Sequence, residues 1–388
     1  YYIIAAFQVI ELYLMAVLEN IAYGKKPHVT GYVAVVHDFT RVILAVILVV
    51  ILKTGLFGVL LSVVLTYIVD LLAYAVTLRE ELLEKPNYGY IREWGKTSFL
   101  SFYGMLASRV SSFDMILLIL FAGTVARAYY GAAAAISAFL AYSSVLSTGL
   151  YPRLLSGGGS QDVNESLKIT FMFSIPMAIG TLMLAPSFLT ILNPTYVAAT
   201  PILYVMAFGS LYMSISSVLS SIIGGTENVD NQRNFTFADL IKSRLFLLPT
   251  FTYIYALIDL PVLYYVLISV EATPEMAGLY CAMIGLTVNA AILALMYRSA
   301  KKCMEFKIPL KTIATCMISS LVMAILVWVL PTPTRISTML TTVGVGCAAY
   351  FGVLTTLDKD ARTLVAAVIR ELRSRFWKQK ETDIDHTR

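Results

Sequence analysis

The sequence predicts an all-α, polytopic integral membrane protein with about eleven membrane-spanning helices. Of its 388 residues, 58% are hydrophobic and 14% are charged, and the mean hydropathy is +0.77. A soluble domain carries about 25% charged residues, so most of this surface must face something other than water. Apolar runs long enough to cross a bilayer recur along the chain. The connections between these runs alternate between rich and poor in lysine and arginine.

Each predicted span is an apolar run of roughly 20 residues, the length that an α-helix needs to cross the hydrocarbon core. Helix is expected because lipid cannot satisfy unpaired backbone polar groups. The segment 258–274 is apolar from Leu260 to Val270 but too short to span, so it either continues a long tilted helix or lies at the interface. The spans are expected at 1–20, 33–53, 55–77, 97–120, 129–151, 168–190, 198–224, 237–258, 275–297, 311–330 and 337–357.

The basic residues of the connections predict the orientation, since cytosolic loops are enriched in lysine and arginine. The connections with few basic residues hold only Lys53, Arg127 and Arg335. The chain is therefore expected to begin outside and to end in the cytosol, as a multi-pass protein of the cytoplasmic membrane. The rich connections hold Lys25 and Lys26; Arg79, Lys85, Arg92 and Lys96; Arg153 and Lys168; Arg233, Lys242 and Arg244; and Arg298, Lys301, Lys302, Lys307 and Lys311.

The tail from residue 359 interleaves basic and apolar side chains between Arg362 and Lys380. This pattern is typical of an amphipathic helix that lies on an anionic inner leaflet. The alternative is a short, solvated basic tail.

Several functions are excluded by what the connections and polar residues contain. The four cysteines and three histidines show no metal-ligand spacing, so we expect no metal and no cofactor, although Na⁺ or H⁺ coupling stays open. The net charge of +5 reflects cytosolic loops and does not indicate nucleic acid. The longest internal loop has about 20 residues and holds no cluster of acids or histidines, which argues against an enzyme.

A weak internal repeat appears when the start of the chain is laid on itself at an offset of 201 residues. The most informative matches pair Gly24 with Gly225 and Asp38 with Asp239. Both copies have the same predicted direction, as in carriers built from two similar halves. Because three spans lie between residue 96 and the second copy, the repeat leads us to expect three further spans upstream of residue 1, absent from this chain.

Three stretches carry a resemblance to a known family. They are WGKTSFLSFYGMLASRVSSFDMILLIL, GTVARAYYGAAAAISAFLAYSSVLSTGLYPRLL, and FSIPMAIGTLMLAPSFLTIL with the following NPTYVAATPILYVMAFGSLYMSISSVLSSIIGG. They resemble the polysaccharide-type (Wzx-like) lipid-linked oligosaccharide flippases of the multidrug/oligosaccharidyl-lipid/polysaccharide (MOP) exporter superfamily. The resemblance covers about 75–357 and rests on packing patterns, since none of the stretches is a catalytic signature.

The resemblance implies two six-helix bundles around a central cavity, two additional C-terminal helices, and alternating access. It implies that the first three predicted spans correspond to the fourth, fifth and sixth membrane-spanning helices of the family. The expected organisation is a remainder of the N-terminal bundle at 1–78, a cytosolic linker at 79–96, a C-terminal bundle at 97–300, two additional helices at 301–358 and the cytosolic tail at 359–388.

Ionisable groups inside predicted spans cost about 2.5–3.5 kcal/mol each on insertion scales, so they are candidate cavity residues. Arg109 lies near the centre of the span 97–120, on a predicted face with Tyr103. A guanidinium that points into an aqueous cavity would bind a lipid pyrophosphate or an acidic sugar. The alternative is a structural ion pair with another helix. Asp114, about 140° around the helix from Arg109, either marks the outer mouth or bonds a neighbouring helix.

Two carboxylates of the first predicted spans complete the candidate set. Asp70 shares a face with Tyr67 and Tyr74, which indicates a sugar-facing or ion-coupling site or a structural Asp satisfied by tyrosine. Glu11, at mid-depth in its span, is a candidate proton or sodium site.

The favoured function is a flippase for a lipid-linked oligosaccharide or a related polyprenyl-(pyro)phosphate glycolipid, with membrane lipids as further partners and a monomer expected by analogy with the family. One alternative is a cation-coupled multidrug-type antiporter of the same superfamily, against which the positive charge of Arg109 argues. The other is a membrane glycosyltransferase or polymerase, which would need the acidic or histidine cluster that the loops lack.

Overall fold

The computed structural model describes residues 2–83, 88–145, 149–226, 243–359 and 361–363, and within them every regular element is helical. The chain divides into two compact units, Tyr1–Glu93 and Trp94–Arg388. The division lies within the expected linker 79–96.

The first unit packs three long helices, α1 (Tyr2–Lys25), α2 (Pro27–Ala45) and α3 (Leu56–Thr77). A π-helical turn, Val46–Ile51, extends α2, and Gly55, at φ 61°, supplies the left-handed turn before α3. The core of the unit consists of Ala22, Val29, Val33, Tyr74 and Leu78.

Lys26, between α1 and α2, contacts residues at the end of α3 and just after it. Its Nζ lies 3.0 Å from Oε1 of Glu81, in the short helix α4 (Arg79–Leu82), and donates to the Thr77 carbonyl at 3.1 Å. This ion pair lies outside the spanning segments, and its hydrogen bond holds the pKa of Glu81 below the usual 4.5.

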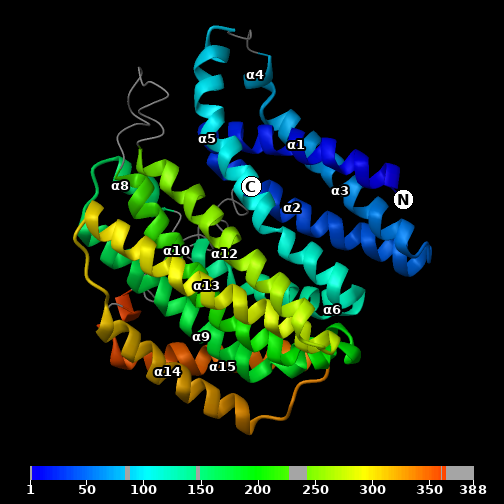
Figure 1. Ribbon diagram of the computed structural model, residues 1–388, viewed down its shortest axis with the longest axis vertical. Helices are drawn as coiled ribbons and strands as arrows, with labels where there is room; N and C mark the ends of the chain where they lie inside the picture. The colour runs from blue at the N-terminus through cyan, green and yellow to red at the C-terminus, as the bar shows by residue number, and fades with distance from the viewer. Residues whose placement is uncertain (1, 84–87, 146–148, 227–242, 360, 364–388) are drawn as a thin grey trace, which may run out of the picture. The chain divides into compact units, whose positions relative to one another are not determined.

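The second unit is a larger helical bundle. In Figure 1 the long helices α9, α10 and α13 run side by side, and α14 and α15 pack on α9. The bounds are α5 (Tyr90–Ser111), α6 (Phe113–Leu140), α7 (Tyr142–Val145), α8 (Leu150–Leu155), α9 (Ser160–Leu192), η2 (Pro194–Ala199), α10 (Thr200–Gly225), η4 (Arg244–Phe246), α12 (Leu247–Ser269), α13 (Pro274–Cys303), α14 (Leu310–Val329) and α15 (Ile336–Leu357).

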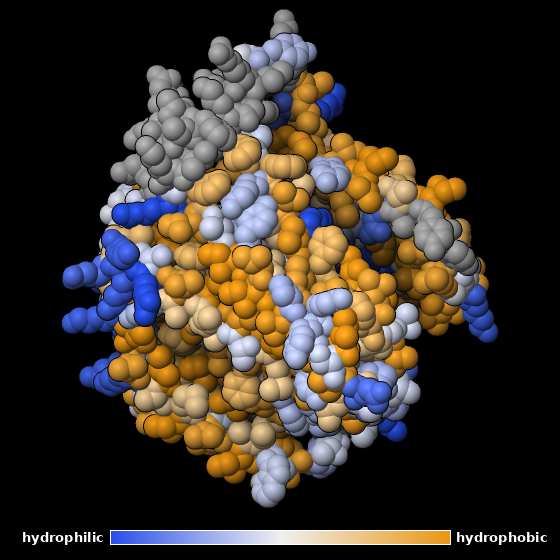
Figure 2. All heavy atoms as spheres, in the orientation of Figure 1, coloured by the Kyte–Doolittle hydropathy of each residue, from blue (hydrophilic) through white to orange (hydrophobic). Residues whose placement is uncertain are grey.

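The prediction of an all-helical, polytopic membrane fold is confirmed. Nine stretches of the described residues are long and apolar enough to cross a membrane, and α1 matches the expected first span. The stretch Ser98–Ser144 contains two expected spans, because Gly123 interrupts it at φ 84° and ψ 176°. Large apolar side chains lie on the surface, such as Trp328 at 80% exposed and Val329 at 73%. Figure 2 shows apolar side chains over much of the visible face, as expected for contact with lipid.

Residues 237–242 of the predicted span 237–258 lie outside the described residues, and the described part differs in its end. The helix α12 begins at Leu247, after the 3₁₀ turn Arg244–Phe246, and continues through Pro261 to Ser269. The apolar run from Leu260 therefore belongs mostly to this helix, the first of the two alternatives. The shift arises because charged residues are interspersed before Leu247, so the lipid-compatible run starts later than the sequence window suggested. The predicted tail helix lies mainly in 364–388, outside the described residues.

Candidate functional site

The first unit holds a buried polar pair between α2 and α3. Nδ1 of His37 lies 2.6 Å from Oδ2 of Asp70, whose side chain is fully buried. Oδ1 of Asp70 has no hydrogen-bond partner among the described residues. The ring of Tyr67 is tilted against the His37 ring at 5.4 Å between centroids. The predicted neighbour Tyr74 is a core residue, 2% exposed.

Glu11 is a second buried carboxylate of the first unit, on α1. It is 2% exposed, and neither of its carboxylate oxygens has a hydrogen-bond partner in the described part of the chain. An ionised carboxylate without a partner is costly in a lipid-facing bundle. The position can therefore hold a proton or accept a cation, the two roles that the sequence suggested.

The second unit brings Asp114 of α6 close to a carboxylate that the sequence analysis did not select. Asp114 accepts a hydrogen bond from the Met115 amide at 2.6 Å and interacts electrostatically with Asp259 of α12 and with Arg127. Asp259 is 2% exposed. Because two carboxylates repel each other, this interaction is not a bond to the neighbouring helix, and both roles expected for Asp114 stay predictions.

Gly285 of α13 lies beside the buried Asp259 and leaves space for polar groups there. A Cβ added there would lie 3.2 Å from the Tyr255 hydroxyl and 3.9 Å from Oδ1 of Asp259, so both polar groups face this glycine. Oδ1 has no hydrogen-bond partner among the residues that the structure describes. A pocket of about 320 Å³ adjoins them, with polar lining residues Tyr130, Ser137, Ser210, Tyr212, Tyr255 and Asn289.

The lining of this hollow is hydroxyl-rich, and the carboxylate of Asp259 lies beside it, near Gly285, without being one of the lining residues. In the described ranges, no group of three or more His, Cys, Asp or Glu side chains has the arrangement of a metal site.

Arg109 and Tyr103 of α5 have different environments. Tyr103 packs on α12: its ring stacks on Phe246 at 4.4 Å, and its carbonyl accepts from the Tyr253 hydroxyl at 3.2 Å. Arg109 is exposed and has no ion-pair partner among the described residues. Tyr103 is therefore a packing residue of α5, whereas the side chain of Arg109 is exposed.

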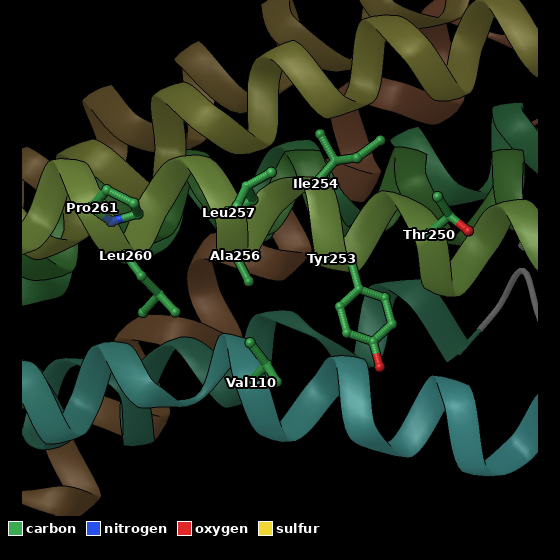
Figure 3. A pocket seen from close by; sticks show the side chains of 8 residues that line it. All are labelled: Val110, Thr250, Tyr253, Ile254, Ala256, Leu257, Leu260 and Pro261. Carbon is green, nitrogen blue, oxygen red and sulfur yellow. The ribbon is translucent and has the colours of Figure 1, made fainter.

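An apolar pocket of about 430 Å³ lies between α5 and α12 (Figure 3). It is lined on α5 by Val110, the residue that follows Arg109 in the sequence. Val110 lies on α5, and the other lining residues lie on α12, where Tyr253 points toward α5. Helix α5 therefore carries the exposed guanidinium of Arg109 and, at the next residue, borders an apolar hollow.

A second apolar pocket, of about 420 Å³, lies among α6, α9, α14 and α15. Its walls include Phe173, Phe188, Met323, Cys347 and Phe351, and nearly all of the lining is apolar. A long hydrocarbon chain is the kind of ligand that such walls accept.

Sequence reasoning missed His37 and Asp259. A signal existed for His37, because it is an ionisable residue inside the expected span 33–53, and such residues need a partner. Asp259 fell in 258–274, which was not assigned to a span, so the same rule was not applied to it.

The chain is similar in structure to a solved "Lipid II flippase MurJ, inward closed conformation". The TM-score is 0.62 at 15% sequence identity, and the match covers 92% of this chain and 73% of that chain. The chain has the fold of MurJ. No family model matches the sequence, and no curated protein does.

The solved neighbour is named as a lipid II flippase, and the expected polytopic helical fold agrees with it. At 15% identity, the likeness concerns the fold alone.

Proposed function

We propose that this protein flips a lipid-linked oligosaccharide, or a related polyprenyl-(pyro)phosphate glycolipid, across the cytoplasmic membrane by alternating access. The observation that carries the proposal is the MurJ fold, because the solved neighbour is a lipid II flippase. The three stretches that resemble the Wzx-like family favour an oligosaccharide as the transported head group.

Such a substrate has a long apolar chain and a charged (pyro)phosphate, and the second unit offers a complement to each. The pocket among α6, α9, α14 and α15 is apolar and suits part of a polyprenyl chain. Arg109 is exposed and unpaired within the described residues, which favours an anion-binding role over the alternative of a structural ion pair. A guanidinium binds phosphate oxygens in a bidentate manner and keeps its charge.

The buried acidic groups are proposed to couple transport to a proton or sodium gradient. Asp114 and Asp259 interact inside the second unit. In the first unit Glu11 is buried, and the buried Asp70 is hydrogen-bonded to the partly exposed His37. Protonation or cation binding removes the cost of burying each charge and can therefore bias which conformation is populated. Tyr67 would assist His37 and Asp70, with Tyr74 and Tyr103 acting through packing.

These same carboxylates favour a second candidate, a cation-coupled multidrug-type antiporter. The exposed charge of Arg109 disfavours cationic drugs, so the flippase is preferred. For topology we propose the domain organisation given above, a cytosolic C-terminus and a monomeric carrier.

The decisive experiment measures transbilayer movement of a fluorescent polyprenyl-pyrophosphate oligosaccharide in proteoliposomes. The variants are Arg109→Ala and a control, Arg153→Ala, which removes an exposed arginine from the short helix α8. A charge-assisted hydrogen bond contributes about 1.5–3 kcal/mol, so Arg109→Ala is expected to weaken substrate binding about 10- to 150-fold and the control to leave it unchanged.

Each outcome has a separate meaning. Movement that survives Arg109→Ala unchanged would retain the flippase and reject the anion-binding role of Arg109. Absence of movement in the unaltered protein, together with ion-driven uptake of a cationic dye, would reject the flippase and favour the antiporter.

A further inference from the structure

A polar pocket of about 600 Å³ lies where α14 begins and α15 ends. Three of its lining residues are lysines from three parts of the chain: Lys168 of α9, Lys311 of α14 and Lys359 just after α15. The remaining lining residues are Ile308, Pro309, Leu310, Thr312, Leu357 and Asp358.

Among the described lining residues, three lysines face one carboxylate, so this part of the lining is basic in balance. That carboxylate, Asp358, accepts a hydrogen bond from the Thr315 hydroxyl at 3.5 Å. Lys311 and Lys359 are exposed, and Lys168 is half-buried in the wall. Lysines from three segments that line one hollow attract a phosphate, because this anion can accept hydrogen bonds from several ammonium groups at once.

Apolar side chains border the same lysines. Leu310 is 72% exposed, Leu357 is 46% exposed and Ile308 is 43% exposed. Both α14 and α15 are candidate spans, so their ends at the pocket lie at a membrane surface. Figure 2 shows hydrophilic side chains gathered at the edge of the molecule where α13 ends and α14 begins. The distribution of basic residues assigns this surface to the cytosol.

We infer that this pocket binds the phosphate headgroup of an anionic phospholipid of the adjacent leaflet, with its acyl chains along the ends of α14 and α15. A free phosphate would use the lysines but not the exposed Leu310, Leu357 and Ile308 beside them. A zwitterionic lipid would use the apolar border without the excess positive charge. The bound lipid anchors the pair α14 and α15 at the surface, and this site is separate from the transported substrate and independent of its identity.

The test titrates the purified chain in detergent with phosphatidylglycerol and, separately, with phosphatidylcholine, and counts bound lipid by native mass spectrometry. The pocket variant carries Lys168→Gln, Lys311→Gln and Lys359→Gln. The control carries Arg298→Gln, Lys301→Gln and Lys302→Gln, which remove the same charge from exposed positions at the end of α13 that do not line the pocket. Each lysine near an anionic lipid is worth roughly a 5-fold change in affinity, so the pocket variant is expected to bind phosphatidylglycerol roughly 100-fold more weakly.

Two further variants guard against misfolding as the cause of lost binding. Lysine-to-arginine replacement at the same three positions keeps the charge and is expected to keep binding. Asp358→Asn removes the one acidic group of the pocket and is expected to tighten phosphatidylglycerol binding roughly 5-fold, a gain that an unfolded protein would not give.

Selective loss in the pocket variant, with binding retained by the control, supports the site. Equal loss in both variants, or equal binding of phosphatidylcholine and phosphatidylglycerol, overturns it. Displacement of the lipid by inorganic phosphate at a comparable concentration also overturns it, since the site would then recognise a free anion.

Discussion

His37 and Asp70 form a polar pair inside the first unit, with Nδ1 of His37 2.6 Å from Oδ2 of Asp70. The two residues lie on neighbouring helices, α2 and α3, 33 residues apart in the sequence. The carboxyl group is fully buried and the histidine is 22% exposed, so the histidine is the more accessible member of the pair. The pair therefore joins a buried carboxyl group to a partly exposed imidazole.

The first prediction is that His37 and Asp70 depend on one another for stability. Removing one partner leaves a buried polar group unsatisfied, which costs about 1–3 kcal/mol, whereas removing both costs less than the sum. The variants His37→Gln, Asp70→Asn and the double variant are expected to show this coupling in thermal unfolding in detergent. Additive effects would contradict the pairing.

Glu80 of α4 provides a control for this cycle, since it is an exposed carboxylate of the same unit outside the His37–Asp70 pair. Glu80→Gln is expected to change the free energy of unfolding by no more than about 0.5 kcal/mol, and its effect is expected to add to that of Asp70→Asn.

The second prediction is that Asp114 and Asp259 couple transport to an ion gradient. Asp259→Asn and Asp114→Asn would remove the group whose charge responds to H⁺ or Na⁺. Coupling free energies are typically about 1–3 kcal/mol, so gradient-driven transport in proteoliposomes is expected to fall about 5- to 150-fold, with exchange in the absence of a gradient less affected.

Glu271, exposed in the connection after α12, is the control for those acidic substitutions. Glu271→Gln is expected to keep gradient dependence. Unchanged gradient dependence in both Asp114→Asn and Asp259→Asn would reject the ion-coupling role of the pair.

The spans were predictable where an apolar run has a sharp boundary. Gly55 precedes α3 and Pro274 begins α13, so both helices appear where the sequence placed them, within a few residues. Gly123 separates the two spans of 98–144, and the sequence had left a gap between 120 and 129. Around 237–258 charged and apolar residues are mixed, and hydropathy could not locate the start of α12.

Several residues of the candidate site were predictable from the sequence, but the pairs that they form were not. The cost of a charge in lipid selected Asp70, Glu11 and Asp114 from the sequence alone. Their partners depend on which helices pack together, as α2 with α3 and α6 with α12. No periodicity along one helix carries that information, so the pairing of Asp70 with His37 and the proximity of Asp114 to Asp259 could not be predicted.

The third prediction concerns the pH dependence of the Lys26–Glu81 ion pair. The hydrogen bond from Lys26 lowers the pKa of Glu81, so the folded state prefers the charged carboxylate. The stabilisation is therefore present above the usual pKa of 4.5 and is lost as the pH falls through the lowered value. Glu81→Gln is expected to lower the Tm in detergent at neutral pH, and the difference from the unaltered protein is expected to vanish at strongly acidic pH.

Glu80, the exposed neighbour of Glu81, tests whether the effect belongs to the ion pair. Glu80→Gln is expected to leave the Tm unchanged across the same pH range. A Glu81→Gln difference that persists after the carboxylate is protonated would show that the ion pair is not its source.

The last prediction tests the apolar pocket among α6, α9, α14 and α15 as a site for the polyprenyl chain. Cys347 lines this pocket, so Cys347→Trp would fill part of it. Displacing about two methylene groups costs about 1.6 kcal/mol, and the KM for a long-chain glycolipid is expected to rise about 15-fold. Transport of a short-chain analogue is expected to stay unchanged because it does not reach the pocket.

Val345→Trp is the matched control, since Val345 is exposed on the same helix but does not line the pocket. It adds the same bulky ring to the lipid-facing surface, where a larger apolar side chain costs little. A rise in KM that is equal for the two variants, or equal for long- and short-chain substrates, would assign the effect to general disturbance of α15. A rise confined to Cys347→Trp and to the long chain would instead mean that the hydrocarbon tail occupies this pocket during transport.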